Sequence, residues 1–142
     1  NPIAKTLSIT TISAERDIAG SLKIDDKADV LCLETVREID NRPLAIGSHY
    51  FSKQRFPDLI EVFKAEGSIS NMLSKFGCGD YERQTTKITA RPPTKREASI
   101  LLQARNLPIL VTESINVDKD KQPIEYGVAR FSADRVQLVV ET

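Results

Sequence analysis

The sequence predicts an α+β fold in which short helices pack on an antiparallel sheet of about six strands. The chain has 142 residues, of which 40% are hydrophobic and 28% are charged, as in an ordinary globular domain with a real core. Segments with the alternation of strands mostly follow one another as hairpins and not through helical crossovers. Four short segments have helical periodicity with helix-start or helix-end residues. These observations predict a single α+β domain over residues 1–142.

Each strand is expected where apolar and β-branched residues alternate, and each helix where a capping residue precedes an apolar period of 3.6. The expected strands are 5–13, 29–39, 43–51, 81–90, 108–117 and 123–132, with "RVQLVVE" (135–141) as the last strand. The expected helices are 15–22, 58–65, a segment from Ser68 that ends at Gly77, and "KREASILLQA" (95–104) capped by Thr94.

Composition excludes several functional classes. Twenty basic and twenty acidic residues cancel, so no large electric field favours binding of DNA or of a membrane by this segment. The two cysteines, Cys32 and Cys78, and the single histidine form no zinc motif, and we expect no metal and no other cofactor. Reduced thiols in a cytosolic protein are the expectation. No apolar run is long enough to span a membrane.

The stretch "REIDNRPLAIGSHYF" (37–51) predicts a tight β-hairpin with Asp40-Asn41 as its turn. With this turn Arg37 faces Leu44, and alternation places Arg37 on a largely apolar face of the sheet. That face is expected to hold Leu31, Leu33, Thr35, Arg37, Leu44, Ile46, Ser48 and Tyr50. His49 points to the other face in this register, and we expect it to be structural.

An arginine on an apolar sheet face needs a partner for its charge. The guanidinium of Arg37 either pairs with a carboxylate, reaches solvent near the hairpin end, or binds an anionic ligand such as a phosphate or a carboxylate. The residues alone leave these alternatives open.

Two further segments are candidates for a ligand site. In "GSISNML" (67–73), Ser68 and Ser70 lie at a helix start, where hydroxyls and free backbone N–H groups attract anions, although simple helix capping explains the same residues. In "QPIEYGVARF" (122–131), Glu125 and Phe131 share one strand face with two small residues, which is typical of a cavity wall. The alternative for Glu125 is an exposed strand carboxylate.

The order of these segments resembles the UTRA domain, the effector-binding domain of GntR-type transcriptional regulators of the HutC subfamily. The resemblance covers nearly the whole chain. It rests on "VREIDNRPLAIGSHYF", "FPDLIEVF", "GSISNML", "ITARPPTKREASILL" and "PILVTESINVDKDKQPIEYGVARFSADRVQLVVE". Within that subfamily, "HYF" followed by "QTTKITAR" is most similar to the regulators of phosphonate metabolism, the PhnF type.

The resemblance implies a chorismate-lyase-like fold with a small effector bound over the sheet. It implies ligand-binding roles for Arg37, for the helix-start residues Ser68 and Ser70, and for Glu125. Two positions depart from the family pattern. Thr35 stands where many members have a second arginine, and Phe131 stands where a tyrosine is common. An anionic head with a short polar tail suits this set of residues.

The chain does not begin with Met, and we expect it to be a piece of a longer protein that carries an N-terminal winged helix-turn-helix. The resemblance then implies a homodimer that binds operator DNA only through that absent domain, with an edge strand such as the first or last one pairing between subunits. We expect no membrane partner.

Two other functions stay open on the sequence. The related lyase fold suggests an enzyme that acts on an anionic substrate, but only Glu125 is available as a general acid or base. A pure dimerisation domain with a degenerate pocket is consistent with Thr35 and Phe131.

Overall fold

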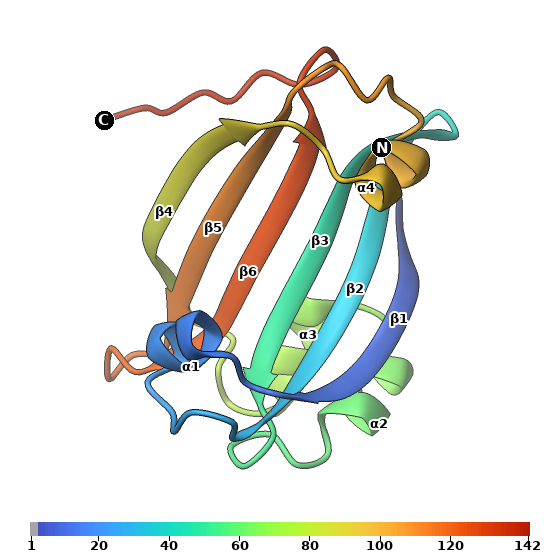
Figure 1. Ribbon diagram of the computed structural model, residues 1–142. Coiled ribbons are helices and arrows are strands. Elements are labelled where there is room, and N and C mark those ends of the chain that lie inside the picture. Colours follow the sequence, from blue (N-terminus) through green and yellow to red (C-terminus); the bar gives the residue numbers. More distant parts are fainter. Residues whose placement is uncertain (1–2) are drawn as a thin grey trace.

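The computed structural model describes residues 3–142 and confirms the predicted α+β architecture of six strands and four short helices (Figure 1). The strands are β1 (Ile3–Ser13), β2 (Asp29–Ile39), β3 (Arg42–Ser52), β4 (Glu82–Arg91), β5 (Ile109–Val117) and β6 (Pro123–Ser132). The helices are α1 (Arg16–Leu22), α2 (Leu59–Glu66), α3 (Ile69–Lys75) and α4 (Lys95–Leu101). No helix within these residues is long and apolar enough to cross a membrane.

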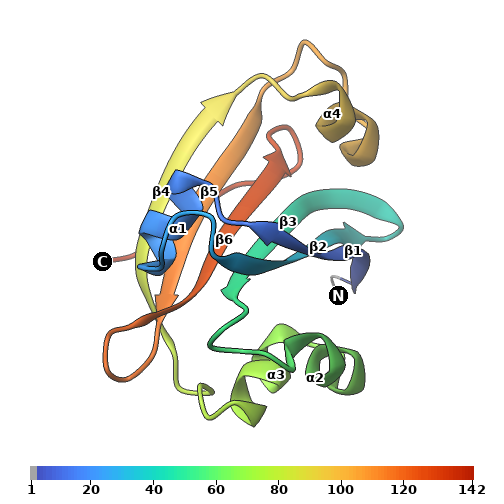
Figure 2. The same ribbon diagram turned by 60° about the horizontal axis from the view of Figure 1, so that its bottom comes forward.

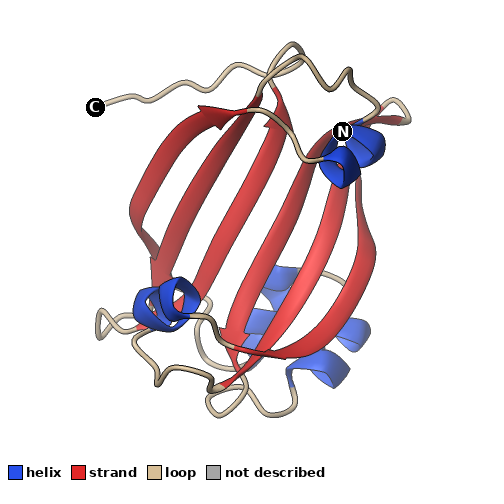
Figure 3. Cartoon of the chain, in the orientation of Figure 1, coloured by secondary structure: helices blue, strands red, loops and turns tan. Residues whose placement is uncertain are grey.

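All six strands form one antiparallel sheet in the order β1-β2-β3-β6-β5-β4 (Figure 3). The longest connection within residues 3–142 carries the chain from β3 through α2 and α3 to β4 at the far edge. The chain then returns inward through β5 to β6, which pairs with β3. This order brings residues from β2, β3, β6, β5 and β4 side by side, although they are distant in the sequence.

The helices cover the two faces of the sheet only partly (Figures 1 and 2). On the α2–α3 face, Leu31 and Phe51 pack against both helices in a core that includes Phe56 and Met72. On the opposite face, the α1–α4 face, α1 covers one end of the sheet and α4 covers the other. Each helix buries one apolar stripe, which is what fixes such short helices in place.

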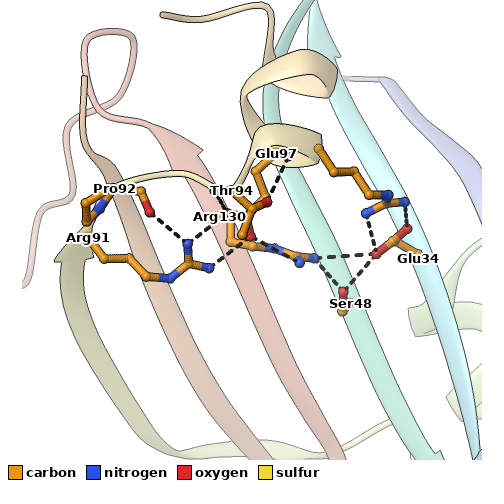
Figure 4. Close-up of polar contacts among 8 residues, drawn as sticks. Glu34, Ser48, Arg91, Pro92, Thr94, Glu97 and Arg130 are labelled. Atoms are coloured by element: carbon orange, nitrogen blue, oxygen red, sulfur yellow. Dashed lines mark hydrogen bonds and ion pairs between the residues drawn. The ribbon is translucent and has the colours of Figure 1, made fainter. Parts of the chain in front are cut away.

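A network of ion pairs anchors α4 to the sheet (Figure 4). Glu97 is 4% exposed and accepts two hydrogen bonds from Arg91, at 2.7 and 2.9 Å. Glu97 also forms a capping box with Thr94. Arg130 of β6 lies between the two carboxylates of the network, with an Nη–Oε distance of 3.6 Å to Glu97 and 3.8 Å to Glu34. The Arg91 guanidinium lowers the pKa of Glu97 to about 2, because its hydrogen bonds favour the carboxylate.

The hairpin turn at Asp40-Asn41 is where the sequence places it. Both residues have positive φ angles, 51° and 63°, which a two-residue hairpin turn of type I′ requires. The predicted register holds for the first two pairs after the turn, Ile39 with Arg42 and Glu38 with Pro43.

A β-bulge then changes the register, and this corrects the predicted faces. Glu38 pairs with Pro43, but Arg37 pairs with Ala45, so Leu44 has no partner on β2. Pro43 has no N–H to donate to the ladder, and a proline in a strand is typically found at such a bulge. Because of the extra residue, the side chains that follow the bulge in β3 lie on the faces opposite to those predicted.

The α2–α3 face therefore combines the predicted β2 residues with the other half of β3. The residues that share it are Leu31, Leu33, Thr35 and Arg37 of β2 with Ala45, Gly47, His49 and Phe51 of β3. The prediction that Ile46, Ser48 and Tyr50 face the side of Arg37 is wrong, and so is the prediction that His49 points away from it. Ser48 instead bonds Arg130 on the α1–α4 face.

The predicted last strand does not form. "RVQLVVE" runs as an extended tail that pairs with no strand within residues 3–142 (Figure 1). A strand forms only where its backbone bonds a neighbouring strand. The edge strands of this sheet are β1 and β4, and the tail pairs with neither.

Candidate functional site

A cavity of about 230 Å³ opens on the α2–α3 face, and every residue that lines it belongs to a strand. Arg37 comes from β2, His49 from β3 and Arg83 from β4. The remaining lining residues are Thr112, Ser114 and Asn116 of β5 with Glu125, Gly127, Val128, Ala129 and Phe131 of β6. The strand alternation and the sheet order thus bring five strands to one hollow.

Small residues make this hollow possible. A Cβ atom placed on Gly127 lies 3.8 Å from Glu125 Oε2 and 3.9 Å from His49 Nδ1, which is ordinary contact, so a larger side chain here extends into the cavity. Gly47 is needed for another reason, because a Cβ atom there lies 2.9 Å from His49 Nε2 and 3.1 Å from Thr35 Oγ1. The absence of side chains at these two positions leaves space for His49.

The floor of the cavity is a hydrogen-bonded chain of polar side chains. Glu125, which is 5% exposed, accepts a bond from Asn116 Nδ2 at 2.9 Å and lies 2.6 Å from His49 Nδ1. Asn116 Oδ1 in turn accepts a bond from Arg83 Nε at 2.7 Å. The two buried members, Glu125 and Asn116, are both paired in this way, which holds them in a fixed geometry.

The chain of bonds also assigns the proton of His49. A carboxylate only accepts hydrogen bonds, so Nδ1 of His49 must carry the hydrogen that points to Glu125. No serine, threonine or cysteine of residues 3–142 is hydrogen-bonded to the other ring nitrogen. The pair therefore lacks the nucleophile of a catalytic triad.

Two guanidinium groups stand at opposite sides of the floor. Arg37 is exposed and makes no hydrogen bond or ion pair with any residue in the described range 3–142. Arg83 bonds only neutral side chains there, Asn116 and, at 3.2 Å, Ser114. Both cations thus line the cavity without a carboxylate partner, and an anion that enters is attracted by both.

This placement removes one of the three alternatives for Arg37 and leaves two, a side chain that reaches solvent near the hairpin end and one that binds an anionic ligand. An internal ion pair is excluded within residues 3–142. The side chain is not buried among apolar residues either, which corrects that expectation, because the hairpin end of the α2–α3 face is left open by the helices. Its charge is available to a ligand in the cavity.

Of the other residues with predicted ligand roles, two line the cavity and three do not. Glu125 and Phe131 line the cavity on β6, whereas Thr35 lies on the same face without being part of the lining. Ser68 and Ser70 do not line it: the Ser68 hydroxyl caps α3 by accepting a bond from Asn71 N–H, and Ser70 lies 3.3 Å from the Tyr81 hydroxyl. Ligand-binding roles of these serines stay a prediction.

Ser68→Ala is expected to lower the free energy of unfolding by about 1 kcal/mol, because the helix loses its side-chain cap. Urea denaturation measures this loss. Ser70→Ala, which leaves the cap in place, is the matched control. If the hydroxyl of Ser68 only caps the helix, binding of an anion in the strand cavity is unchanged in both variants.

Sequence reasoning missed six residues that line the cavity: His49, Arg83, Thr112, Ser114, Asn116 and Val128. The signal for His49 was Pro43, because a proline inside a strand is typical of a bulge. Arg83 and the β5 residues reach the site only through the sheet order, which no local pattern in the sequence specifies.

A larger depression of about 620 Å³ lies elsewhere, beside the loops around residues 23–29 and 52–57. None of its lining residues is buried, so its polar groups are loosely held and solvated. No group of three or more His, Cys, Asp or Glu side chains in residues 3–142 is placed to hold a metal ion. The strand cavity is therefore the candidate site.

The fold and the cavity over the sheet define a ligand-binding domain of the effector type, and the chain belongs to the UTRA domain family. The sequence model of that family matches residues 1–137. The family resemblance inferred from the sequence is confirmed.

Curated relatives are transcriptional regulators. An uncharacterized HTH-type transcriptional regulator of Rhizobium meliloti (strain 1021) is 34% identical over 131 residues, which cover 92% of this chain and 54% of that protein. The HTH-type transcriptional repressor PhnF of Mycolicibacterium smegmatis is 28% identical over 125 residues, covering 88% of this chain and 51% of that one. The chain thus spans about half the length of these relatives.

Solved structures share the fold. The effector domain of PhnF from Mycobacterium smegmatis superposes with a TM-score of 0.88 at 24% identity, and covers 100% of this chain and 87% of that one. A ligand-binding domain of a GntR-family regulator from Bordetella bronchiseptica gives 0.87 at 18% identity, covering 99% and 92%.

Proposed function

We propose that this UTRA domain binds a small anionic metabolite, a phosphonate or a phosphate-like compound, in the strand cavity. Binding changes the operator affinity of a winged helix-turn-helix domain in the same protein. The observation that carries the proposal is the exposed, unpaired guanidinium of Arg37 at the rim of a cavity whose polar floor is already satisfied. An arginine that lines a cavity and has no ion-pair or hydrogen-bond partner within residues 3–142 is suited to an anion.

The cavity favours a compact ligand. Its volume of about 230 Å³ lies below the roughly 300 to 1,000 Å³ of sites for drug-sized ligands. Arg37 and Arg83 attract negative charge, and the Glu125–His49 pair between them accepts hydrogen bonds from an amine or hydroxyl on the ligand. An anionic head with a short polar tail fits this arrangement.

Thr35 in place of a second arginine leaves fewer charges for a phosphate clamp on β2. Arg83, which reaches the cavity from β4, supplies a cation from the other side. The two cations of the cavity therefore come from β2 and β4, and not both from β2. We take this different placement of charge to support a ligand other than a sugar phosphate, in agreement with the resemblance to regulators of phosphonate metabolism.

A sensing role is favoured over an enzyme. The cavity offers no activated nucleophile, and the acid–base pair Glu125 and His49 is held in hydrogen bonds within its floor. A working site is also favoured over a degenerate one, since two arginines that have no carboxylate partner in residues 3–142 line the cavity. The regulator we propose is a homodimer that reads two DNA half-sites.

Arg37→Ala is expected to abolish the stabilisation of the domain by an anionic ligand. Thermal melts with inorganic phosphate, alkylphosphonates, aminoalkylphosphonates, sugar phosphates and amino-acid derivatives identify the compound that raises the melting temperature of the unaltered chain. The variant then shows no rise with the same compound, because the free guanidinium is gone.

Arg105→Ala is the matched control, since Arg105 is also exposed and does not line the cavity. It retains the full rise. A panel in which no compound raises the melting temperature contradicts the sensor and favours a degenerate pocket, and turnover of a compound favours an enzyme. A gel shift of the full-length regulator then tells whether the compound releases DNA or recruits it.

A further inference from the structure

Two carboxylates of the described chain are almost fully buried, and only one of them has an arginine as its partner. Glu97 is 4% exposed and Glu125 is 5% exposed. Glu97 is matched by the guanidinium groups of Arg91 and Arg130. Glu125 forms no ion pair with any lysine or arginine of residues 3–142. A buried charge without a counter-charge is costly, so the carboxylate of Glu125 needs a cation from elsewhere.

The arginine that is linked to the floor of the cavity does not contact this carboxylate. Arg83 donates its Nε hydrogen to Asn116 Oδ1 at 2.7 Å, and Asn116 Nδ2 donates to Glu125 Oε1 at 2.9 Å. The neutral amide of Asn116 therefore separates the two charges by two hydrogen bonds. Their attraction is weaker at this distance than in a direct ion pair.

The geometry around His49 fits a neutral imidazole. Nδ1 lies 2.6 Å from Glu125 Oε2, while Nε2 lies over Gly47, 2.9 Å from the position of a Cβ atom on that residue. No side chain of residues 3–142 is hydrogen-bonded to Nε2. A second ring hydrogen at Nε2 has no acceptor in this range, whereas the neutral ring presents a lone pair there.

The floor thus offers the ligand negative charge and hydrogen-bond acceptors. The unused lone pairs of Glu125 and of His49 Nε2 accept hydrogen bonds and donate none. Both residues line the cavity, and Gly127 beside them leaves the space above the floor open. An ammonium group has three N–H donors, a positive charge and no acceptor, and it therefore matches this floor better than a hydroxyl group does.

We propose that the ligand of this domain is zwitterionic, with its anionic head at Arg37 and a protonated amine on the floor at Glu125 and His49. The inference rests on the proposed function, which places a small anionic compound in the strand cavity, and it specifies the polar tail of that compound. The ammonium group supplies the counter-charge that no lysine or arginine of residues 3–142 gives to Glu125.

The two charged groups of the ligand are expected several bonds apart. Arg37 pairs with Ala45, which pairs with Phe131, so Arg37 and Phe131 lie in one row across the sheet. Glu125 and Phe131 are both on β6, about 20 Å apart along the strand at roughly 3.3 Å per residue. The long side chains of Arg37 and Glu125 shorten this separation but do not close it. An amine at the far end of a short chain reaches the floor, and an amine on the carbon that carries the head does not.

Isothermal titration of the chain with aminoalkylphosphonates that carry the amine on the last of two to five carbons tests the proposal. Each compound is compared with the hydroxyalkyl and the plain alkyl phosphonate of the same length. In the length that binds most tightly, the amine is expected to bind about tenfold more tightly than the hydroxyl compound, because hydrogen bonds between charged groups are stronger. Aminomethylphosphonate is expected to have no such advantage over hydroxymethylphosphonate.

Glu125→Gln is expected to remove the advantage of the amine, so that the amino and hydroxyl compounds differ by less than about threefold. The substitution keeps the shape of the side chain, and urea denaturation checks that the variant is folded. Glu61→Gln is the matched control, because Glu61 is exposed and does not line the cavity, and it retains the full advantage. The comparison of ligands on the unaltered chain stands by itself if Glu125→Gln does not fold.

The outcomes separate this inference from the proposed function. Alkyl or hydroxyalkyl phosphonates that bind as tightly as the amines overturn the zwitterion and leave the anion site in place. An advantage of the amine that survives in Glu125→Gln places the ammonium group elsewhere and also overturns it. If neither the amines nor any other anion binds, the anionic ligand of the proposed function is overturned as well.

Discussion

Glu97→Ala is expected to lower the free energy of unfolding by about 3 kcal/mol, because it removes the carboxylate that two arginines share. Glu97 is almost fully buried and joins Arg91 at the end of β4 to Arg130 in the middle of the sheet (Figure 4). Its loss also deletes the acceptor for the Thr94 N–H, which is half of the capping box of α4. A pKa lowered from 4.5 to about 2 corresponds to a stabilisation of roughly 3 kcal/mol for the ionised form.

Urea denaturation at neutral pH measures this loss. Glu61→Ala is the control, because Glu61 is an exposed carboxylate in the first turn of α2, and its removal is expected to change stability by less than about 0.5 kcal/mol. Equal effects of the two substitutions contradict the anchoring role of Glu97.

The ion pair between Glu97 and Arg91 also predicts how stability depends on pH. Since the folded state lowers the pKa of Glu97, its contribution is complete above pH 4.5 and is lost as the pH falls through about 2. The difference in stability between the unaltered chain and Glu97→Gln is therefore expected to shrink across this acid range. A difference that stays constant from pH 7 to 2 contradicts the lowered pKa.

The sequence predicted most elements of the fold because the signals are local. Alternation places Thr35 and Arg37 on one face of β2, and Asp40-Asn41 forms the turn because these two residues tolerate positive φ. Likewise, Thr94 and Glu97 form the capping box that starts α4.

Features that depend on partners far away in the chain were not predictable in this way. The bulge at Leu44 turned His49 to the side of Arg37, because one extra residue inverts every following side chain. Arg83 reached the cavity because β4 is paired with β5, which is paired with β6. The tail after Arg135 has a strand sequence, but a strand requires an edge to pair with.

The cavity and the ion-pair network lie on opposite faces of the same strands. On β3, His49 lines the cavity and the adjacent Ser48 bonds Arg130, while on β6, Arg130 lies between the cavity residues Ala129 and Phe131. A shift of β3 or β6 that accompanies ligand binding must move a group in the network that holds α4.

Gly127→Val is expected to abolish binding of the anionic compound that stabilises the unaltered chain, with little loss of fold stability. The added Cβ lies in ordinary contact with Glu125 and His49, and the two methyl groups occupy the floor of a cavity of only about 230 Å³. Valine is a better strand residue than glycine, so the free energy of unfolding is expected to change by less than about 1 kcal/mol.

This substitution tests the location of the site independently of its charge. Arg37→Ala removes a cation and leaves the volume, whereas Gly127→Val removes the volume and leaves both arginines. Gly20→Ala in α1 is the control, because a Cβ atom there meets nothing within 4 Å and lies outside the cavity lining. Isothermal titration of the three variants with the same compound is expected to show heat of binding for Gly20→Ala alone. Binding by Gly127→Val with unchanged affinity means that the anion is held by surface charge outside the strand cavity, because no ligand shares the floor with a valine side chain.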